Sequence, residues 1–71
     1  MSVIKISVSE VGKRGSREIQ LAPASNILDL LKELDQSPEV VIVRRNGKIV
    51  AEEEQLADGD EIEIIHVVSG G

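Results

Sequence analysis

One predicted helix, placed between two groups of alternating segments, limits the folds that this chain can adopt more than any other feature. Four aliphatic residues recur at the i, i+3, i+4 and i+7 spacing of one helix face: Ile27, Leu30, Leu31 and Leu34. Ordering a helix of about ten residues costs more free energy than the burial of four aliphatic side chains returns. The helix is therefore not stable by itself and is expected to pack on a sheet.

The limits of this helix follow from the residues around it. Pro23 breaks the preceding strand, and Ser25 or Asn26 can cap the first turn. Asp29 lies in that turn, where a negative charge is favourable beside the positive end of the helix dipole. We expect Ser37-Pro38 to end the helix.

Alternation of apolar and polar residues predicts the strands of the sheet. In Val3–Ser9, every second residue from Ile4 onward is aliphatic, as in a strand with one buried face. Gly12 to Ser16 is a glycine-bounded turn, and Asn46-Gly47 is the strongest hairpin signal in the chain. The predicted strands are Val3–Ser9, Arg17–Leu21, Val40–Arg45, Lys48–Val50 and Glu61–Val68.

The last predicted strand, after the turn Asp58-Gly59-Asp60, is apolar enough to lie in the middle of the sheet. A central last strand beside the first one would run parallel to it, and the helix supplies the necessary crossover. The order therefore predicts an α+β roll of the β-grasp type, with a mixed sheet of four to five strands and one helix on one face.

Composition narrows the class of protein. The chain has 71 residues, no cysteine and no aromatic residue, so we expect one domain with an aliphatic core and no thiolate metal site. A net charge of −5 argues against nucleic-acid binding, which needs a basic surface. No segment approaches the length of a membrane span, and the N-terminus resembles a strand more than a signal peptide. We expect a soluble, cytoplasmic protein.

The sequence closes on Val68-Ser69-Gly70-Gly71, directly after an apolar strand. A carboxylate on glycine, which lacks a Cβ, can enter a narrow channel and be approached by ATP from either side. We expect a folded domain over residues 1–68, a flexible tail over residues 69–71, and a reacting carboxyl on Gly71. Gly70 would supply steric freedom, and Ser69 and Val68 would belong to the segment that enters a partner.

The whole pattern resembles the ubiquitin-like β-grasp superfamily and, within it, the small sulfur carriers of the ThiS and MoaD type. The matching parts are the helix stripe from Ile27 to Leu31, the turn from Arg45 to Val50, and the stretch from Leu56 to Gly71. This last stretch is the most specific, because it combines a leucine, the Asp-Gly-Asp turn, an apolar strand and the glycine pair.

The resemblance implies a carrier cycle. A ubiquitin-activating-type adenylyltransferase would use Mg-ATP to adenylate Gly71, and a persulfide on a sulfur-donating enzyme would then displace AMP. The resulting C-terminal thiocarboxylate would pass its sulfur to an accepting synthase. The chain would be a protein co-substrate, not an enzyme, with no catalytic residue, bound cofactor or metal of its own.

Three members of this superfamily are possible matches. The short length, and His66-Val67-Val68 where molybdopterin-type carriers usually have prolines, favour a carrier for the thiazole of thiamine. A molybdopterin synthase small subunit remains an alternative. The other alternative is a protein modifier or transfer-RNA-thiolation carrier, whose activated terminus also reaches lysines.

The outer face of the last strand suggests where a partner docks. Ile62 and Ile64 continue the inward set, so Ile65 and Val67 fall on the opposite face, where polar residues are expected. Ile42 and Arg44 on the neighbouring strand extend this surface.

Other chemistry-bearing residues have simpler interpretations. His66 is the single histidine and lacks the partners of a metal site or a catalytic base. Lys13, Arg14 and Arg17 are interpreted as a solvated turn, and Asp58 and Asp60 as turn formers. Glu52-Glu53-Glu54 is interpreted as an exposed loop that guards a sheet edge.

Overall fold

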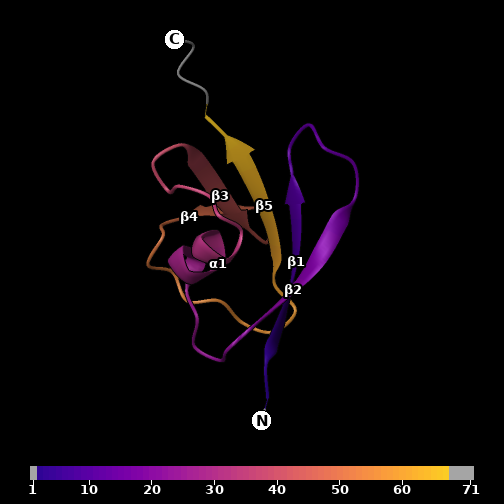
Figure 1. Ribbon diagram of the computed structural model, residues 1–71, viewed down its shortest axis with the longest axis vertical. Helices are drawn as coiled ribbons and strands as arrows, with labels where there is room; N and C mark the ends of the chain where they lie inside the picture. The colour runs from indigo at the N-terminus through magenta and orange to yellow at the C-terminus, as the bar shows by residue number, and fades with distance from the viewer. Residues whose placement is uncertain (1, 68–71) are drawn as a thin grey trace.

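The computed structural model describes residues 2–67, so the predicted tail Val68–Gly71 lies outside the described part of the chain. Five strands and one helix follow one another along the chain (Figure 1). Their bounds are β1 Ile4–Glu10, β2 Ser16–Leu21, α1 Ile27–Glu33, β3 Val41–Arg45, β4 Lys48–Val50 and β5 Glu61–His66. Each predicted strand is present, with ends that differ by at most two residues.

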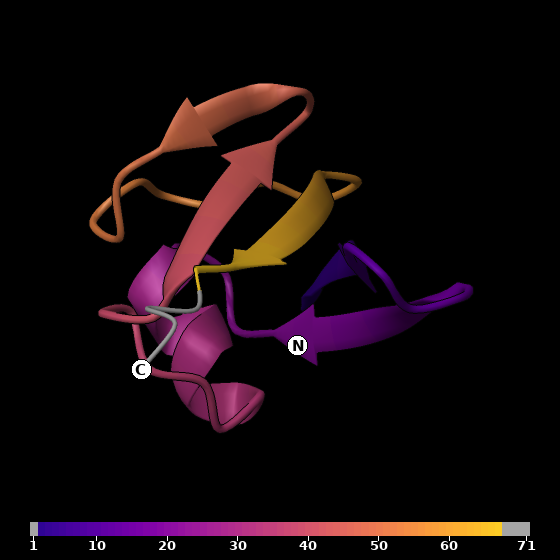
Figure 2. The same ribbon diagram turned by 90° about the horizontal axis from the view of Figure 1, so that it is seen from above.

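The five strands form one mixed sheet in the order β2-β1-β5-β3-β4. β5 lies in the centre and runs parallel to β1, while the other pairs are antiparallel. Figure 2 shows α1 on one face of this sheet, with the other face open. The predicted α+β β-grasp roll is therefore confirmed, with five strands.

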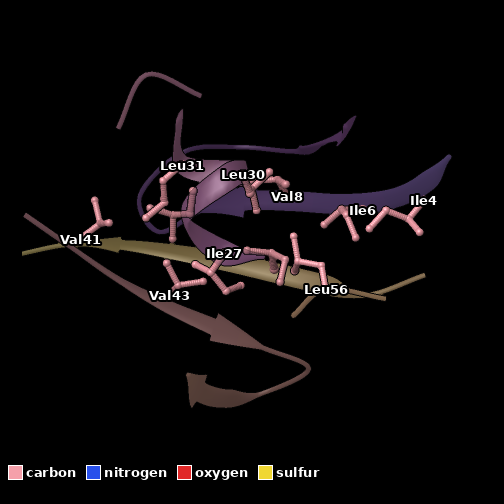
Figure 3. Close-up of a cluster of buried hydrophobic side chains, with 11 residues drawn as sticks. Ile4, Ile6, Val8, Ile27, Leu30, Leu31, Val41, Val43 and Leu56 are labelled. Atoms are coloured by element: carbon pink, nitrogen blue, oxygen red, sulfur yellow. The ribbon is translucent and has the colours of Figure 1, made fainter. Parts of the chain in front are cut away.

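The core lies between α1 and the inner face of the sheet (Figure 3). Every buried hydrophobic side chain is aliphatic, as the absence of aromatic residues requires. Ile6, Ile27, Leu30 and Ile64 are fully buried, and Leu34 packs against the edge of the cluster. Within residues 2–67, no helix is long and apolar enough to cross a membrane.

The start of α1 agrees with its predicted cap. Asn26 Oδ1 accepts a hydrogen bond from Asp29 N at 2.9 Å, and Asp29 Oδ2 accepts one from Asn26 N at 3.1 Å. This reciprocal pair is a capping box that satisfies two backbone donors at the helix end.

The end of α1 corrects the prediction that Ser37-Pro38 stops the helix. The helix ends at Glu33, because Asp35 adopts a left-handed conformation with φ of 57°. Asp35 N donates to Lys32 O at 3.2 Å, and Gln36 N donates to Leu31 O at 2.8 Å. This is the Schellman pattern, which aspartate can support because it tolerates left-handed φ. The proline therefore follows a helix that has already ended.

Asp60 has a larger structural role than turn formation. Its side chain is buried, and it accepts hydrogen bonds from Arg45 Nε at 2.7 Å, Ala57 N at 2.8 Å and Asn46 Nδ2 at 3.2 Å. Asn46 in turn accepts a bond from Glu61 N at 2.9 Å. The carboxylate thus joins the β3–β4 hairpin to the loop that leads into β5.

Asp60→Ala is expected to lower the free energy of unfolding by about 2–3 kcal/mol, because Arg45 and two further donors lose a buried charged acceptor. Urea denaturation followed by circular dichroism measures this change. Asp58→Ala is the matched control, because exposed Asp58 accepts one hydrogen bond, from Lys5 N. Equal losses for the two variants would contradict the role assigned to Asp60.

Candidate functional site: the end of β5 and the outer face of the sheet

The site predicted from the sequence is built around β5. Because β1 and β5 are parallel, the C-terminal ends of both strands point in the same direction, toward the β1–β2 turn (Figure 1). Val67 continues past β5 and donates from its backbone N to Val40 O at 2.8 Å. Val68, Ser69, Gly70 and Gly71 follow this anchored position and lie outside the described residues.

The outer face carries an apolar surface over β3, β4 and β5. Ile42 lies directly opposite Ile65 in the β3–β5 register, so the structure brings together two residues that sequence analysis had grouped. Val67 is 48% exposed and Ile42 is 38% exposed, whereas Ile65 is half-buried. We call Ile42, Ile49, Ile65 and Val67 the outer patch. Such a group of exposed aliphatic side chains is typical of an interaction surface.

Ile49 was not among the residues predicted for this surface. It is 70% exposed, and its position in β4 lies opposite Arg44 of β3, on the same face. The weak signal was the alternation in Lys48–Val50, but a strand of three residues does not tell which face is buried. Pairing with β3 decides it.

An ion pair lies beside the outer patch. Arg44 Nη2 is 2.8 Å from Glu63 Oε1, and these residues are directly opposite each other in β3 and β5. Arg44 Nε is buried and has no hydrogen-bond partner within the described part of the chain.

A chain of polar contacts ties the base of the tail to its surroundings. His66 Nε2 donates to Gln36 Oε1 at 3.1 Å, and Gln36 Nε2 lies 3.5 Å from Glu10 Oε1. Lys13 Nζ forms an ion pair with Glu10 Oε2 at 3.0 Å. The hydrogen bond from Lys13 lowers the pKa of Glu10 below its ordinary value, with smaller contributions from the charges of Lys13, His66 and Arg17.

These contacts give His66 a positioning role. The structure places it in a hydrogen bond between β5 and the loop after α1. Among residues 2–67, no group of three or more histidine, aspartate, glutamate or cysteine side chains is placed to hold a metal ion. Lys13 is exposed beyond its pair with Glu10, in agreement with the interpretation of this turn as solvated.

The mixed five-stranded sheet with one helix on one face defines a ubiquitin-like β-grasp protein. Solved structures share this fold, including subunit 1 of a molybdopterin converting factor from Pyrococcus furiosus, at 21% identity and a TM-score of 0.77 over 92% of this chain and 99% of that one. A ubiquitin from Caldiarchaeum subterraneum is similar at 21% identity and a TM-score of 0.73, over 99% of this chain and 100% of that one. The ThiS family model matches residues 6–71, and the chain belongs to the ThiS family.

Membership places the chain among small sulfur carriers and ubiquitin-like proteins. Proteins of this kind are carriers rather than catalysts, and they work with activating and sulfur-transfer enzymes. The matched range extends through the glycine pair and therefore includes the predicted reacting residue, Gly71.

Proposed function

We propose that the protein is a sulfur carrier whose working group is the α-carboxyl of Gly71. A partner adenylyltransferase uses Mg-ATP to convert this carboxylate to an acyl adenylate, with release of pyrophosphate. The terminal sulfur of a persulfide on a second enzyme attacks the carbonyl carbon, and AMP leaves. A second thiol on the sulfur-donating enzyme then attacks the enzyme-side sulfur of the acyl disulfide, which leaves a disulfide on that enzyme and a thiocarboxylate on Gly71. The carrier itself supplies no catalytic group and binds no cofactor.

The family match through Gly71 is the observation that carries this proposal. The position of β5 adds support, because the strand that leads to the terminus is central and hydrogen-bonded on both sides. A strand held in this way fixes the point from which the tail departs. A partner can then receive the terminus in a defined register relative to the folded domain.

We further propose that the outer patch docks the adenylyltransferase. It lies on the open face of the sheet and includes Val67, the last described residue before the tail. Ile65 and Ile42 form its centre, and the partly exposed ion pair of Arg44 and Glu63 lies at its border. An apolar centre with a polar border is the usual composition of a protein interface.

Ile65→Asp is expected to leave the fold intact but to raise the KM of the adenylyltransferase for the carrier by about tenfold or more, as loss of an interface anchor does. Steady-state ATP–pyrophosphate exchange measures the KM, and circular dichroism checks the fold. Val3→Asp is the matched control, because Val3 is 46% exposed and precedes β1, away from the outer patch. Unchanged kinetics for Ile65→Asp would refute the docking proposal.

The preferred acceptor of the sulfur is the thiazole precursor of thiamine, on the ground of chain length and the residues before the tail. The structural similarity to the Pyrococcus furiosus protein keeps a molybdopterin precursor as the alternative. The similarity to an archaeal ubiquitin keeps a modifier role as a third candidate. Incubation of the thiocarboxylate form with each purified synthase distinguishes the two cofactor roles, because only the cognate synthase consumes the sulfur.

The intact mass of the protein from its native host tests the proposal directly. A mass increase equal to the exchange of one oxygen for one sulfur, located on Gly71 by fragmentation, is the expected result. Reconstitution with the adenylyltransferase, ATP and a persulfide donor should raise the fraction of this species. Failure to form it under those conditions, together with conjugates that leave a Gly-Gly remnant on lysines, would favour the modifier role instead.

A further inference from the structure

A concave surface lies between α1 and the β4 edge of the sheet. It has a volume of about 230 Å³ and is lined by apolar side chains of α1, β3 and β4, among them Ile27, Leu31 and Val50. Ile42 and Ile49 of the outer patch also line it, so the two surfaces meet at the β4 edge. Pro38 and Ala51 line it as well, and Glu52 is its single charged lining residue. We call this surface the edge groove.

The fold explains why the edge groove is open. β4 is an edge strand of three residues, with β3 as its one neighbour in the sheet. The backbone groups on the other side of an edge strand are available to pair with an added strand. The chain also has no aromatic side chain that could fill a gap between a helix and a sheet edge. An extended segment could therefore add to β4 and place a side chain in the groove.

The acidic run Glu52-Glu53-Glu54 borders the groove and is held in place by its backbone. Leu28 N donates to Glu52 O and Ile27 N donates to Glu54 O, each at 2.9 Å, so the run lies against the first turn of α1. All three glutamates are exposed. Glu54 has a distant ion pair with Arg45, at 3.9 Å, whereas Glu52 and Glu53 form none within residues 2–67.

We propose that the β4 edge and the edge groove bind an extended segment of a partner protein that carries one large apolar side chain flanked by lysine or arginine. A cavity of about 150 Å³ can hold a molecule the size of benzene, so this groove has room for one aliphatic or aromatic side chain. It is smaller than the roughly 300–1,000 Å³ of typical small-molecule sites. The unpaired carboxylates Glu52 and Glu53 would attract the flanking cations.

A second copy of this chain is a poorer occupant. Each copy carries a net charge of −5 and no aromatic side chain that could serve as an anchor. The proposed site shares Ile42 and Ile49 with the outer patch but extends to Ile27, Leu31 and Glu52, whereas Ile65 and Val67 do not line it. Binding at the groove does not depend on chemistry at Gly71.

The test is a titration of the isotope-labelled full chain with a synthetic peptide, followed by two-dimensional amide NMR. The peptide has one leucine at the centre of a five-residue stretch of threonines, and two lysines at each end so that either strand direction can be accommodated. The control peptide has glutamates in place of the lysines. We expect saturable shifts at β4, at the start of α1 and at Glu52–Glu54, but no shifts with the control peptide.

Two protein variants separate charge attraction at the groove from general charge effects. Glu52→Lys with Glu53→Lys should weaken binding of the lysine peptide about tenfold, and added salt should weaken binding to the unchanged protein. Glu18→Lys with Glu61→Lys changes the net charge equally at exposed sites on β2 and β5 and should not reduce affinity more than twofold.

Four outcomes would overturn the proposal. They are no saturable shift at millimolar lysine peptide, equal binding of the glutamate peptide, shifts centred on Ile65 and Val67, or a concentration-dependent dimer that buries β4 without peptide. Because the titration needs no enzyme and no ATP, its result is separable from that of the proposed sulfur-carrier function.

Discussion

Adding one alanine after Gly71 is expected to reduce adenylation of the carrier by at least about a hundredfold. The extension moves the terminal carboxyl by about 3.5 Å along an extended chain and places a Cβ beside it. A displacement of about 1 Å can already cost a reaction about a hundredfold in rate, because attack on the α-phosphorus needs a defined geometry. ATP–pyrophosphate exchange with the partner adenylyltransferase measures the loss.

The extended protein also separates binding from chemistry. If the folded domain docks through the outer patch, the extended protein should inhibit adenylation of the unmodified carrier, with an inhibition constant near the KM. Gly71→Ala is the matched variant, because it adds the Cβ without moving the carboxyl. Its rate of adenylation should lie between that of the unmodified carrier and that of the extended protein. Adenylation of the extended protein at the normal rate would show that the terminal carboxyl is not the reacting group.

Leu31→Asp is expected to leave the chain unfolded at room temperature. Leu31 is 1% exposed and lies in the core between α1 and the sheet. Truncation of a buried leucine costs about 2–5 kcal/mol, and a buried carboxylate without a partner costs more. A domain of this length has a free energy of unfolding of roughly 4–11 kcal/mol. The destabilisation expected for Leu31→Asp is therefore comparable with the whole free energy of unfolding.

Far-ultraviolet circular dichroism and amide NMR dispersion detect this loss. Lys32→Asp is the matched control, because it introduces the same residue at the next position of α1, where the side chain is exposed. We expect that variant to stay folded, with a loss of about 1 kcal/mol or less, since a negative charge in the last turn opposes the helix dipole. A folded Leu31→Asp variant would show that α1 does not carry the core.

Periodicity was sufficient for most of the fold. The apolar stripe from Ile27 to Leu34 indicates which face of α1 is buried, and the alternation in β1 and β2 does the same for those strands. Only a few packing arrangements of one helix and a sheet bury all of these faces. Asn46-Gly47 fixed the β3–β4 register, since both residues adopt the positive φ that a two-residue hairpin requires. The end of α1 was misplaced because Asp35 takes a conformation that glycine usually takes.

The face on which the proposed docking residues lie was predictable within a single strand, but not where it depends on contacts between strands. The last strand placed Ile65 and Val67 on the outer face, and the Ile42–Ile65 pair agrees with that prediction. Ile49, the unpaired Arg44 Nε and the edge groove depend on which strands become neighbours. No local pattern specifies those neighbours.

The sequence by itself determined the elements, the inward face of the longer strands and the aliphatic character of the core, because these follow from the spacing of apolar residues along one chain. The tertiary structure decided the neighbours: Asp60 beneath the β3–β4 hairpin, Glu63 beside Arg44, and the acidic run against the start of α1. Contacts between residues distant in sequence depend on how sheet and helix pack as a whole. Packing free energy is a property of the assembled core and of no single segment.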